Sequence, residues 1–184
     1  MGPVPEGRDP EEYDRLRRRL LWALPTGLFV LGSRHEGRRN LMTVSWVTQV
    51  ATAPKLVAAS VEAGSVTGGL VSGSGRFALT MLGRADKHVV RRFVKPAADV
   101  DVDEETGRGT MSGEPVVGAP SGVPVLAAAG AWLDCAVRQR VELGSHLLFV
   151  GEVTDCGVGA PGAAEADAPG EWLRMEDTRM NYGG

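Results

Sequence analysis

The first residues with chemical potential form a polar set inside an otherwise apolar stretch, residues 40–51. Its polar members are Asn40, Thr43, Ser45, Thr48 and Gln49. Alternation along a strand places Thr43 and Ser45 on one face. Val44 and Trp46 then belong to the opposite face. Buried hydroxyls and amides are costly unless they are hydrogen-bonded. Either nearby segments of the same chain or a flat polar ligand must therefore supply those hydrogen bonds.

A second polar group occurs at Ser65-Val-Thr67-Gly-Gly, where the pattern predicts the start of a short helix. A helix N-terminus offers unpaired backbone N–H groups and partial positive charge, and the two hydroxyls can join them around a phosphate. Ordinary helix capping by Ser65 explains the same residues. Both interpretations stay open at this stage.

His146 follows the turn Gly144-Ser145 and begins an apolar strand. Its ring is therefore expected at the rim of a sheet, where it would either contact a ligand or pack as a core or capping histidine. The chain has three histidines in all, and their scattered positions predict no metal site.

The glycine pattern at residues 157–162 formally matches the dinucleotide-binding fingerprint. Its context is wrong, because Pro161 and an alanine-rich acidic run follow where a helix should open. A flexible loop is the better interpretation. The sequence also contains neither a G-x-S-x-G nucleophile elbow nor an H-E-x-x-H zinc motif.

Composition excludes several classes of protein. The 184 residues are expected to form one domain, and a net charge of −3 gives no electrostatic footprint for nucleic acid. No apolar run approaches the ~20 residues needed to cross a bilayer, and no signal peptide is recognisable. The two cysteines, Cys135 and Cys156, exclude a disulfide framework and fit the reducing cytoplasm. Cys135 lies on an alternating apolar face and is expected to be a buried small hydrophobe.

The expected elements favour a mainly β (α+β) domain, an antiparallel barrel with a few short helices. Asp9 should cap a first helix, Ser65 a second and Asp86 a third. Six strands are expected at 28–31, 40–51, 55–61, 76–82, 131–143 and 146–153, with possible short strands at 125–129 and 171–175. Residues 1–8 form a tail, and residues 95–124 and 157–170 are expected to be loops.

Taken together and in order, these parts resemble the flavin reductase-like family. That family comprises split-barrel flavin-binding proteins, including flavoredoxins and the reductase components of two-component monooxygenases. The resemblance covers most of the chain outside the tail and the two loops. It rests on Leu24-Pro-Thr-Gly27, Asn40-Leu-Met-Thr-Val-Ser-Trp46, Pro54-Lys-Leu-Val-Ala-Ala-Ser60, Thr67, Ser74-Gly-Arg-Phe77, Met81-Leu82, the strand from His146 to Val153, and the closing Asn-Tyr-Gly-Gly.

The resemblance implies an antiparallel split β-barrel, usually a homodimer, that binds FMN or FAD in a groove at the subunit interface. It implies hydride transfer from NADH or NADPH to the flavin, with reduced flavin passing to a partner monooxygenase. The protein would then have no nucleic-acid, membrane or metal partner. A non-enzymatic flavin- or haem-binding electron-transfer protein of the same fold is the alternative. A structural homologue that binds no flavin is a third possibility.

By position, the resemblance also assigns roles to single residues. His146 matches a histidine near the flavin ring or the nicotinamide and takes the catalytic position. The expected cofactor contacts are Asn40, Thr43, Val44, Ser45 and Trp46 along the ring, Ala59 and Ser60 on the next strand, Ser65 and Thr67 at the phosphate, and Tyr182 as a closing aromatic. Some members carry a lysine after the first long loop. Lys95 matches it only approximately, so its role is left open.

Overall fold

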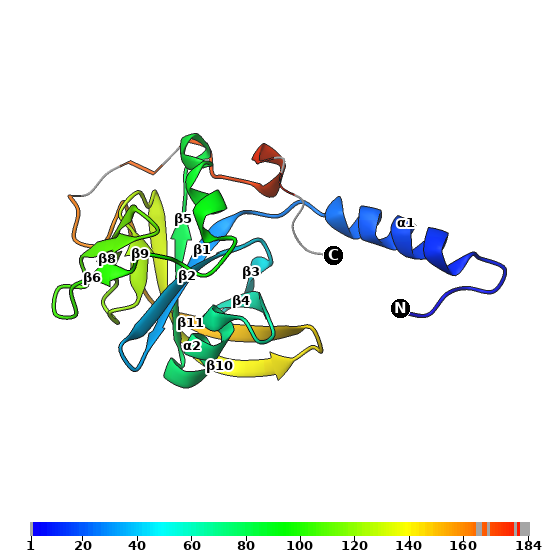
Figure 1. Ribbon diagram of the computed structural model, residues 1–184, viewed down its shortest axis with the longest axis horizontal. Coiled ribbons are helices and arrows are strands. Elements are labelled where there is room, and N and C mark those ends of the chain that lie inside the picture. The colour runs from blue at the N-terminus through cyan, green and yellow to red at the C-terminus, as the bar shows by residue number, and fades with distance from the viewer. Residues whose placement is uncertain (1, 165–166, 169, 179, 181–184) are drawn as a thin grey trace.

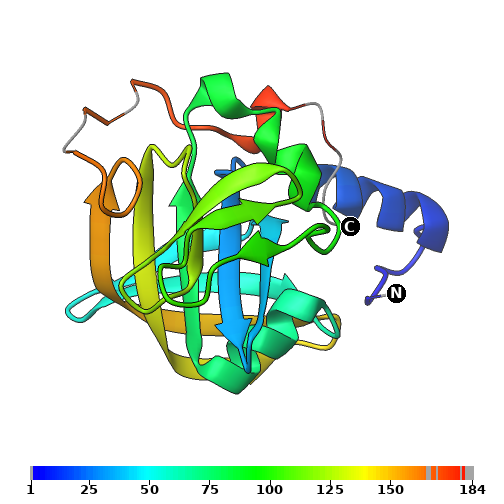
Figure 2. The same cartoon turned by 60° about the vertical axis from the view of Figure 1, so that its left-hand side comes forward.

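The computed structural model describes residues 2–164, 167–168, 170–178 and 180. Its main element is a curved antiparallel sheet of seven strands in the order β2-β1-β5-β10-β11-β4-β3. The strands are β1 (Phe29–His35), β2 (Arg38–Val44), β3 (Val47–Thr52), β4 (Lys55–Glu62), β5 (Arg76–Met81), β10 (Ala131–Glu142) and β11 (His146–Val158). The predicted antiparallel split barrel is therefore confirmed, and Figure 2 shows how strongly the sheet curls.

The two edge strands of this sheet are neighbours in sequence. β2 ends at Val44 and β3 begins at Val47, so only Ser45 and Trp46 join the two edges. Residues 40–51 were predicted to be one strand, and that prediction was wrong. The chain bends at Ser45–Trp46, because β2 pairs with β1 whereas β3 pairs with β4 on the far side of the sheet. The sheet is left open at this corner.

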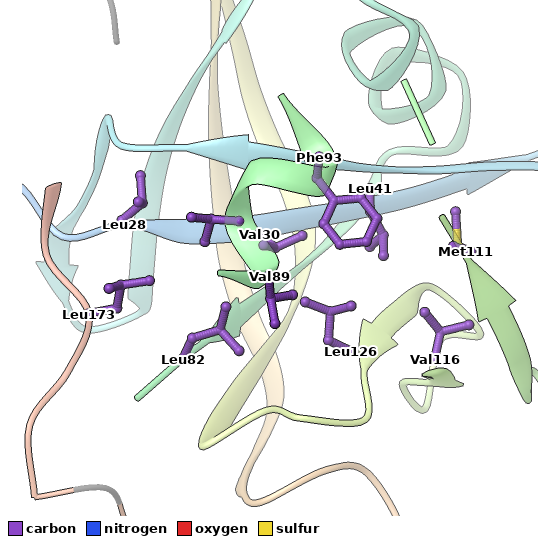
Figure 3. Packing of buried hydrophobic residues seen from close by; sticks show 11 residues of the cluster. Leu28, Val30, Leu41, Leu82, Val89, Phe93, Met111, Val116, Leu126 and Leu173 are labelled. Atoms are coloured by element: carbon purple, nitrogen blue, oxygen red, sulfur yellow. The ribbon is translucent and has the colours of Figure 1, made fainter. Parts of the chain in front are cut away.

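Alternation along the strands produces two hydrophobic clusters on opposite faces. Leu31 on β1 points into the barrel, where it packs with Phe77, Cys135 and Phe149. Its neighbour Val30 belongs to an outer cluster, shown in Figure 3, that lies between the sheet and the segments covering it. That cluster consists of Leu28, Val30, Leu41, Leu82, Val89, Val90, Phe93, Met111, Val116, Leu126 and Leu173. Successive side chains of the strand thus point to opposite faces of the sheet, as strand geometry requires.

Short helices cover the barrel. α2 (Val66–Ser74) begins at Ser65, whose Oγ accepts a hydrogen bond from Gly68 N at 3.1 Å, as the capping pattern predicted. The helix predicted after Asp86 is instead two 3₁₀ turns, η1 (Arg84–Asp86) and η2 (Val89–Phe93). Asp86 lies inside η1 and caps neither turn. Val89, Val90 and Phe93 of η2 all enter the outer cluster.

Residues 95–124 are not the unstructured excursion that the sequence predicted. They contain β6 (Asp101–Val102), β7 (Gly109–Met111), β8 (Glu114–Gly118) and the start of β9 (Pro124–Leu126), which form a second antiparallel sheet. Glu104 pairs with Arg34 at 3.1 Å and also with Arg39, tying this sheet to the β1–β2 hairpin. The approach is close enough to require Gly32, since a Cβ there would lie 2.1 Å from Pro124 O.

The N-terminal helix packs only loosely against the rest of the molecule. α1 (Pro10–Trp22) is capped by Asp9, whose Oδ1 accepts a hydrogen bond from Glu12 N at 2.9 Å, as predicted. No residue of α1 is buried, and Figure 1 shows the helix projecting from the barrel. Its apolar residues Leu20, Leu21 and Trp22 are therefore largely exposed, near the point where the chain enters the barrel.

The C-terminal segment returns across the barrel. The expected strand at 171–175 is absent; isolated bridges pair Trp172 with Gly83 and Arg174 with Gly27, and η3 (Met175–Asp177) follows. Leu173 N donates to Leu82 O at 2.9 Å, and Leu28 N donates to Leu173 O at 3.1 Å. The segment therefore lies between the end of β5 and the start of β1.

Arg84 secures this segment through ion pairs. Its guanidinium donates to Asp177 Oδ1 at 2.7 Å and to Glu171 Oε2 at 2.9 Å. The hydrogen bond from Arg84 is the main reason that the pKa of Asp177 lies below its ordinary value. Because the folded-state pKa is depressed, this stabilisation is present above the unfolded pKa of about 3.9 and is lost as pH falls through the folded pKa.

We therefore expect Asp177→Asn to lower the unfolding midpoint near pH ~7 and to have little effect near pH ~2, where the wild-type carboxylate is also protonated. Thermal unfolding of both proteins across this range measures the effect. Glu176→Gln is the matched control, since Glu176 is exposed and its ion pair in the described part of the chain is the 3.4 Å contact with Arg174. Equal destabilisation by Asp177→Asn at both ends of the range would show that Arg84 does not act through charge.

Candidate functional site

A pocket of about 770 Å³ opens at the corner where β2 passes into β3. Ser45 and Trp46 of the corner, Ser60 of β4, and Leu143, Ser145 and His146 at the β10–β11 turn form its barrel side. The C-terminal segment contributes Arg174, Met175, Glu176 and Met180. The end of α1 and the following residues complete it with Arg18 and residues 21–26. Five segments far apart in sequence thus meet at the open seam of the barrel.

The side chains of Trp46 and His146 form a pair of neighbouring rings in the pocket. The centroids of Trp46 and His146 lie 4.7 Å apart, with the ring planes inclined at 48°. Ser145 Oγ and His146 Nδ1 are hydrogen-bonded at 2.9 Å, which fixes the orientation of the imidazole. Within the described part of the chain, His146 Nε2 has no protein hydrogen-bond partner. The pocket therefore contains a held imidazole with one ring nitrogen available to a ligand.

Register explains why these residues meet. His146 begins β11 and pairs with Glu62, while Leu148 pairs with Ser60 on β4. Ser60 N donates to Trp46 O at 2.9 Å, so the corner is hydrogen-bonded to β4. Trp46 is 42% exposed and is not part of the hydrophobic core. Strand alternation assigned it to the core face, but alternation ends at Val44 because the chain bends there.

Four of the expected site residues line this pocket: Ser45, Trp46, Ser60 and His146. Two others, Val44 and Ala59, point into the barrel core, so only their backbone is available to a ligand. Tyr182 lies outside the described residues. The contact of each of these residues with a flavin stays a prediction.

The remaining expected contacts have protein partners. Asn40 Nδ2 donates to Thr67 Oγ1 at 2.8 Å, and Asn40 Oδ1 accepts from Ala97 N at 2.7 Å. Thr43 Oγ1 donates to Val90 O at 2.6 Å, beneath η2. Asn40, Thr43 and Thr67 are all buried, and Ser65 caps α2. Other residues of the same chain supply the hydrogen bonds of these side chains. Their contact with a cofactor stays a prediction.

Sequence reasoning missed the residues that α1 and the C-terminal segment bring to the pocket. Arg18, Trp22, Leu143, Ser145 and Arg174 line it, but only tertiary structure places them there. One signal was available, since Leu20, Leu21 and Leu24 are apolar residues at the end of a helix that carries many arginines. Such a combination indicates an apolar surface next to positive charge.

The described residues offer little other chemistry. No group of three or more His, Cys, Asp or Glu side chains among them is placed to hold a metal ion. Cys135 is fully buried, as expected, and burial, with the nearby Asp134 charge, raises the pKa of its thiol to about 12. That thiol stays protonated and unreactive at neutral pH. No helix in the described part of the chain is long and apolar enough to cross a membrane.

Comparison with known proteins assigns this arrangement to a family. The family model described as the flavin reductase like domain matches residues 21–176, which include all the described pocket residues except Arg18 and Met180. The chain belongs to the flavin reductase-like family. The expected resemblance is thereby confirmed.

Two relatives in this family are 31% identical to the chain. One is the NADH-dependent flavin reductase StyB of Pseudomonas fluorescens, aligned over 153 residues that cover 83% of this chain and 80% of the relative. The other is an NADH-dependent FAD reductase of Streptomyces globisporus, aligned over 156 residues with the same coverage of each chain.

Solved structures of family members have the same fold. The NADH:FAD oxidoreductase SgcE6 of Streptomyces globisporus matches with a TM-score of 0.69 and 25% identity, covering 98% of both chains. The styrene monooxygenase flavin reductase of Pseudomonas putida S12 matches with a TM-score of 0.62 and 28% identity, covering 78% of this chain and 87% of that one. A structure of SgcE6 in complex with NAD and FAD fragments also matches, at 27% identity and a TM-score of 0.64 over 90% of this chain and 99% of that one.

Thr67 was predicted to contact the phosphate of the cofactor, but it accepts a hydrogen bond from Asn40. A variant of Thr67 tests whether its role is structural or in cofactor binding. Thr67→Val removes the hydroxyl and leaves Asn40 Nδ2 without its acceptor in a buried site. We expect a loss of about 1–3 kcal/mol in the free energy of unfolding, measured by urea denaturation, with an unchanged flavin dissociation constant. Ser72→Ala, at an exposed position of α2, is the control. Weaker flavin binding at full stability would instead support the phosphate role.

Proposed function

We propose that this protein is an NAD(P)H-dependent flavin reductase that transfers a hydride from the nicotinamide to FMN or FAD. The observation that carries the proposal is the pocket at the Ser45–Trp46 corner, which holds the Trp46–His146 ring pair in a chain of the flavin reductase-like family. Both relatives at 31% identity are named as NADH-dependent, which favours NADH as the donor.

The residues of the pocket fit a flavin. Its volume of about 770 Å³ lies within the ~300–1,000 Å³ range of small-molecule sites. Apolar walls from Trp22, Leu143 and Met175 suit a flat aromatic ring, and the hydroxyls of Ser45 and Ser60 suit its polar edge. Every buried side-chain nitrogen and oxygen in the described residues has a protein partner. Ligand contacts therefore come from the partly exposed groups that line the pocket.

When bound, the flavin supplies the hydride-accepting ring, so the protein needs no nucleophile or acid–base dyad of its own. The task of the chain is to orient two ring systems and to exclude water. Trp46 supplies an aromatic wall. His146, held by Ser145, is positioned to hydrogen-bond a ring substituent through Nε2. The hydroxyls of Ser45 and Ser60 define the polar side of the pocket.

The function is tested by mixing the purified protein with NADH or NADPH and with FMN or FAD, and following the loss of nicotinamide absorbance. We expect oxidation that depends on added flavin and is faster with NADH. His146→Ala should lower kcat/KM about tenfold, the effect of losing one hydrogen bond of ~1.4 kcal/mol. His88→Ala, an exposed histidine outside the pocket, should have no effect. Failure of all four pairings would overturn the proposal.

A partner oxygenase would consume the product. One of the structural relatives is the flavin reductase of a styrene monooxygenase, and another relative is the reductase subunit of a stachydrine N-demethylase from Rhizobium meliloti. By analogy, this protein acts as the reductase component of a two-component monooxygenase in the cytoplasm. Reduced flavin leaves the open pocket and reaches the oxygenase by diffusion.

The exposed apolar face of α1 supports a homodimer. Leu20, Leu21 and Trp22 are 60%, 64% and 49% exposed, and Leu143 across the pocket is 54% exposed. An exposed patch of this kind next to a ligand site is typical of a protein–protein interface. A second copy of the chain would cover the patch and close the pocket.

We expect light scattering to give twice the chain mass of 19.4 kDa for the wild-type protein. Leu20→Glu places a charge in the patch and should shift the mass to that of one chain. Arg15→Glu changes charge on the same helix outside the patch and should leave the dimer intact. A wild-type protein with the mass of a single chain at working concentration would contradict the dimer.

A further inference from the structure

Two arginines line the pocket and have no assigned role. Arg18 comes from α1 and Arg174 from the C-terminal segment, so they are 156 positions apart in the sequence but line the same cavity. Glu176 is the single acidic residue among the described lining residues. The described lining residues therefore include two arginines and one carboxylate, although the chain as a whole has a net charge of −3.

Both guanidiniums are only weakly paired. Arg18 Nε lies 3.3 Å from Asp14 Oδ2, whereas Arg17 makes the closer contact to that carboxylate, at 2.7 Å. Arg174 Nη1 lies 3.4 Å from Glu176 Oε1, and both of those side chains are at least two-thirds exposed. Exposed ion pairs of this kind contribute about 0–1 kcal/mol, so either arginine can turn to another anion at little cost.

Arg84, on the neighbouring segment, is different. It donates to Asp177 and Glu171 at 2.7 and 2.9 Å and holds the C-terminal segment in place. Arg174 directly precedes η3 in that same held segment, so its backbone is fixed while its side chain makes the 3.4 Å ion pair with Glu176. A fixed backbone with a weakly paired guanidinium leaves the side chain able to contact a ligand.

The chemistry of an arginine pair at such a position fits a phosphate. The guanidinium presents N–H groups in a planar fork that matches phosphate oxygens, and two of them can hold a pyrophosphate. The predicted phosphate residues Ser65 and Thr67 do not line this pocket. The ring pair Trp46–His146 and the two arginines do, which matches a ligand with an aromatic ring at one end and phosphate at the other.

We propose that Arg18 and Arg174 form a phosphate-recognition pair that binds the phosphate groups of a nucleotide substrate in this pocket. The proposal rests on the proposed reductase function for its choice of substrates. Two nucleotides present that chemistry, the dinucleotide hydride donor and the flavin nucleotide. The experiment distinguishes them by pairing each with an analogue that lacks phosphate.

The variants are Arg18→Gln, Arg174→Gln and the double variant, with Arg19→Gln as control because Arg19 is an exposed arginine of α1 outside the pocket. If the pair binds the donor, KM for NADH rises about tenfold in each single variant and further in the double variant, with kcat nearly unchanged. The rate with 1-benzyl-1,4-dihydronicotinamide, a donor without phosphate, stays at the wild-type value. If the pair binds the flavin, FMN binding weakens by a similar factor and riboflavin binding is unchanged.

Binding is also measured without turnover. Calorimetric titration with ADP-ribose, and fluorescence titration with FMN and riboflavin, report affinity in proteins that are catalytically silent. Arg174→Lys should recover part of the lost affinity, since it keeps the charge but not the fork. Raising the ionic strength should weaken phosphate-dependent binding in the wild type more than in the double variant.

Equal losses with the phosphate-free analogues, or losses no larger than those of Arg19→Gln, would overturn the proposal. A wild-type protein that oxidises neither NADH nor NADPH would instead overturn the reductase function. In that case, tighter binding of FMN than of riboflavin, abolished in the double variant, would still support the phosphate-recognition pair. The two failures are therefore distinguishable.

Discussion

The shape of the barrel depends on how short the connection between its two edge strands, β2 and β3, is. Two residues, Ser45 and Trp46, join the opposite edges of a seven-stranded sheet, so the sheet must curl until those edges meet. The hydrogen bond from Ser60 N to Trp46 O holds the corner against β4. The edge strands β2 and β3 are not paired with each other, and the barrel is open there. The pocket and its ring pair occupy this opening.

The polar side chains beside the corner divide according to which layer covers them. Thr43 lies beneath η2 and donates to the backbone of Val90, and Asn40 joins Thr67 to the segment at Ala97. These bonds tie β2 to α2 and to the outer layer. Ser45, just beyond the end of β2, lines the pocket instead. Over residues 40–45, polar side chains thus change from holding the fold to lining a cavity.

Much of this could be predicted from sequence because the signal is local. The β10–β11 hairpin follows from the alternation after Ala131 and the turn at Gly144–Ser145, and α2 follows from its cap. The bend at Ser45–Trp46 was missed because Trp46-Val47 is as apolar as a continuing strand. The strands between residues 95 and 124 were missed because they are short and rich in glycine and proline. Arg18 and Arg174 reach the site only through tertiary packing, which no local pattern encodes.

The N-terminal helix carries a consequence for how this protein responds to dilution. α1 has 13 residues and buries none of them, and an isolated helix of that length is only marginally stable in water. Contacts that cover Leu20, Leu21 and Trp22 would therefore stabilise it. Where that cover is a second molecule, association and helix formation are one equilibrium, and apparent stability rises with protein concentration. One wall of the pocket would then exist only above a threshold concentration, and dilution alone would act as an off-switch.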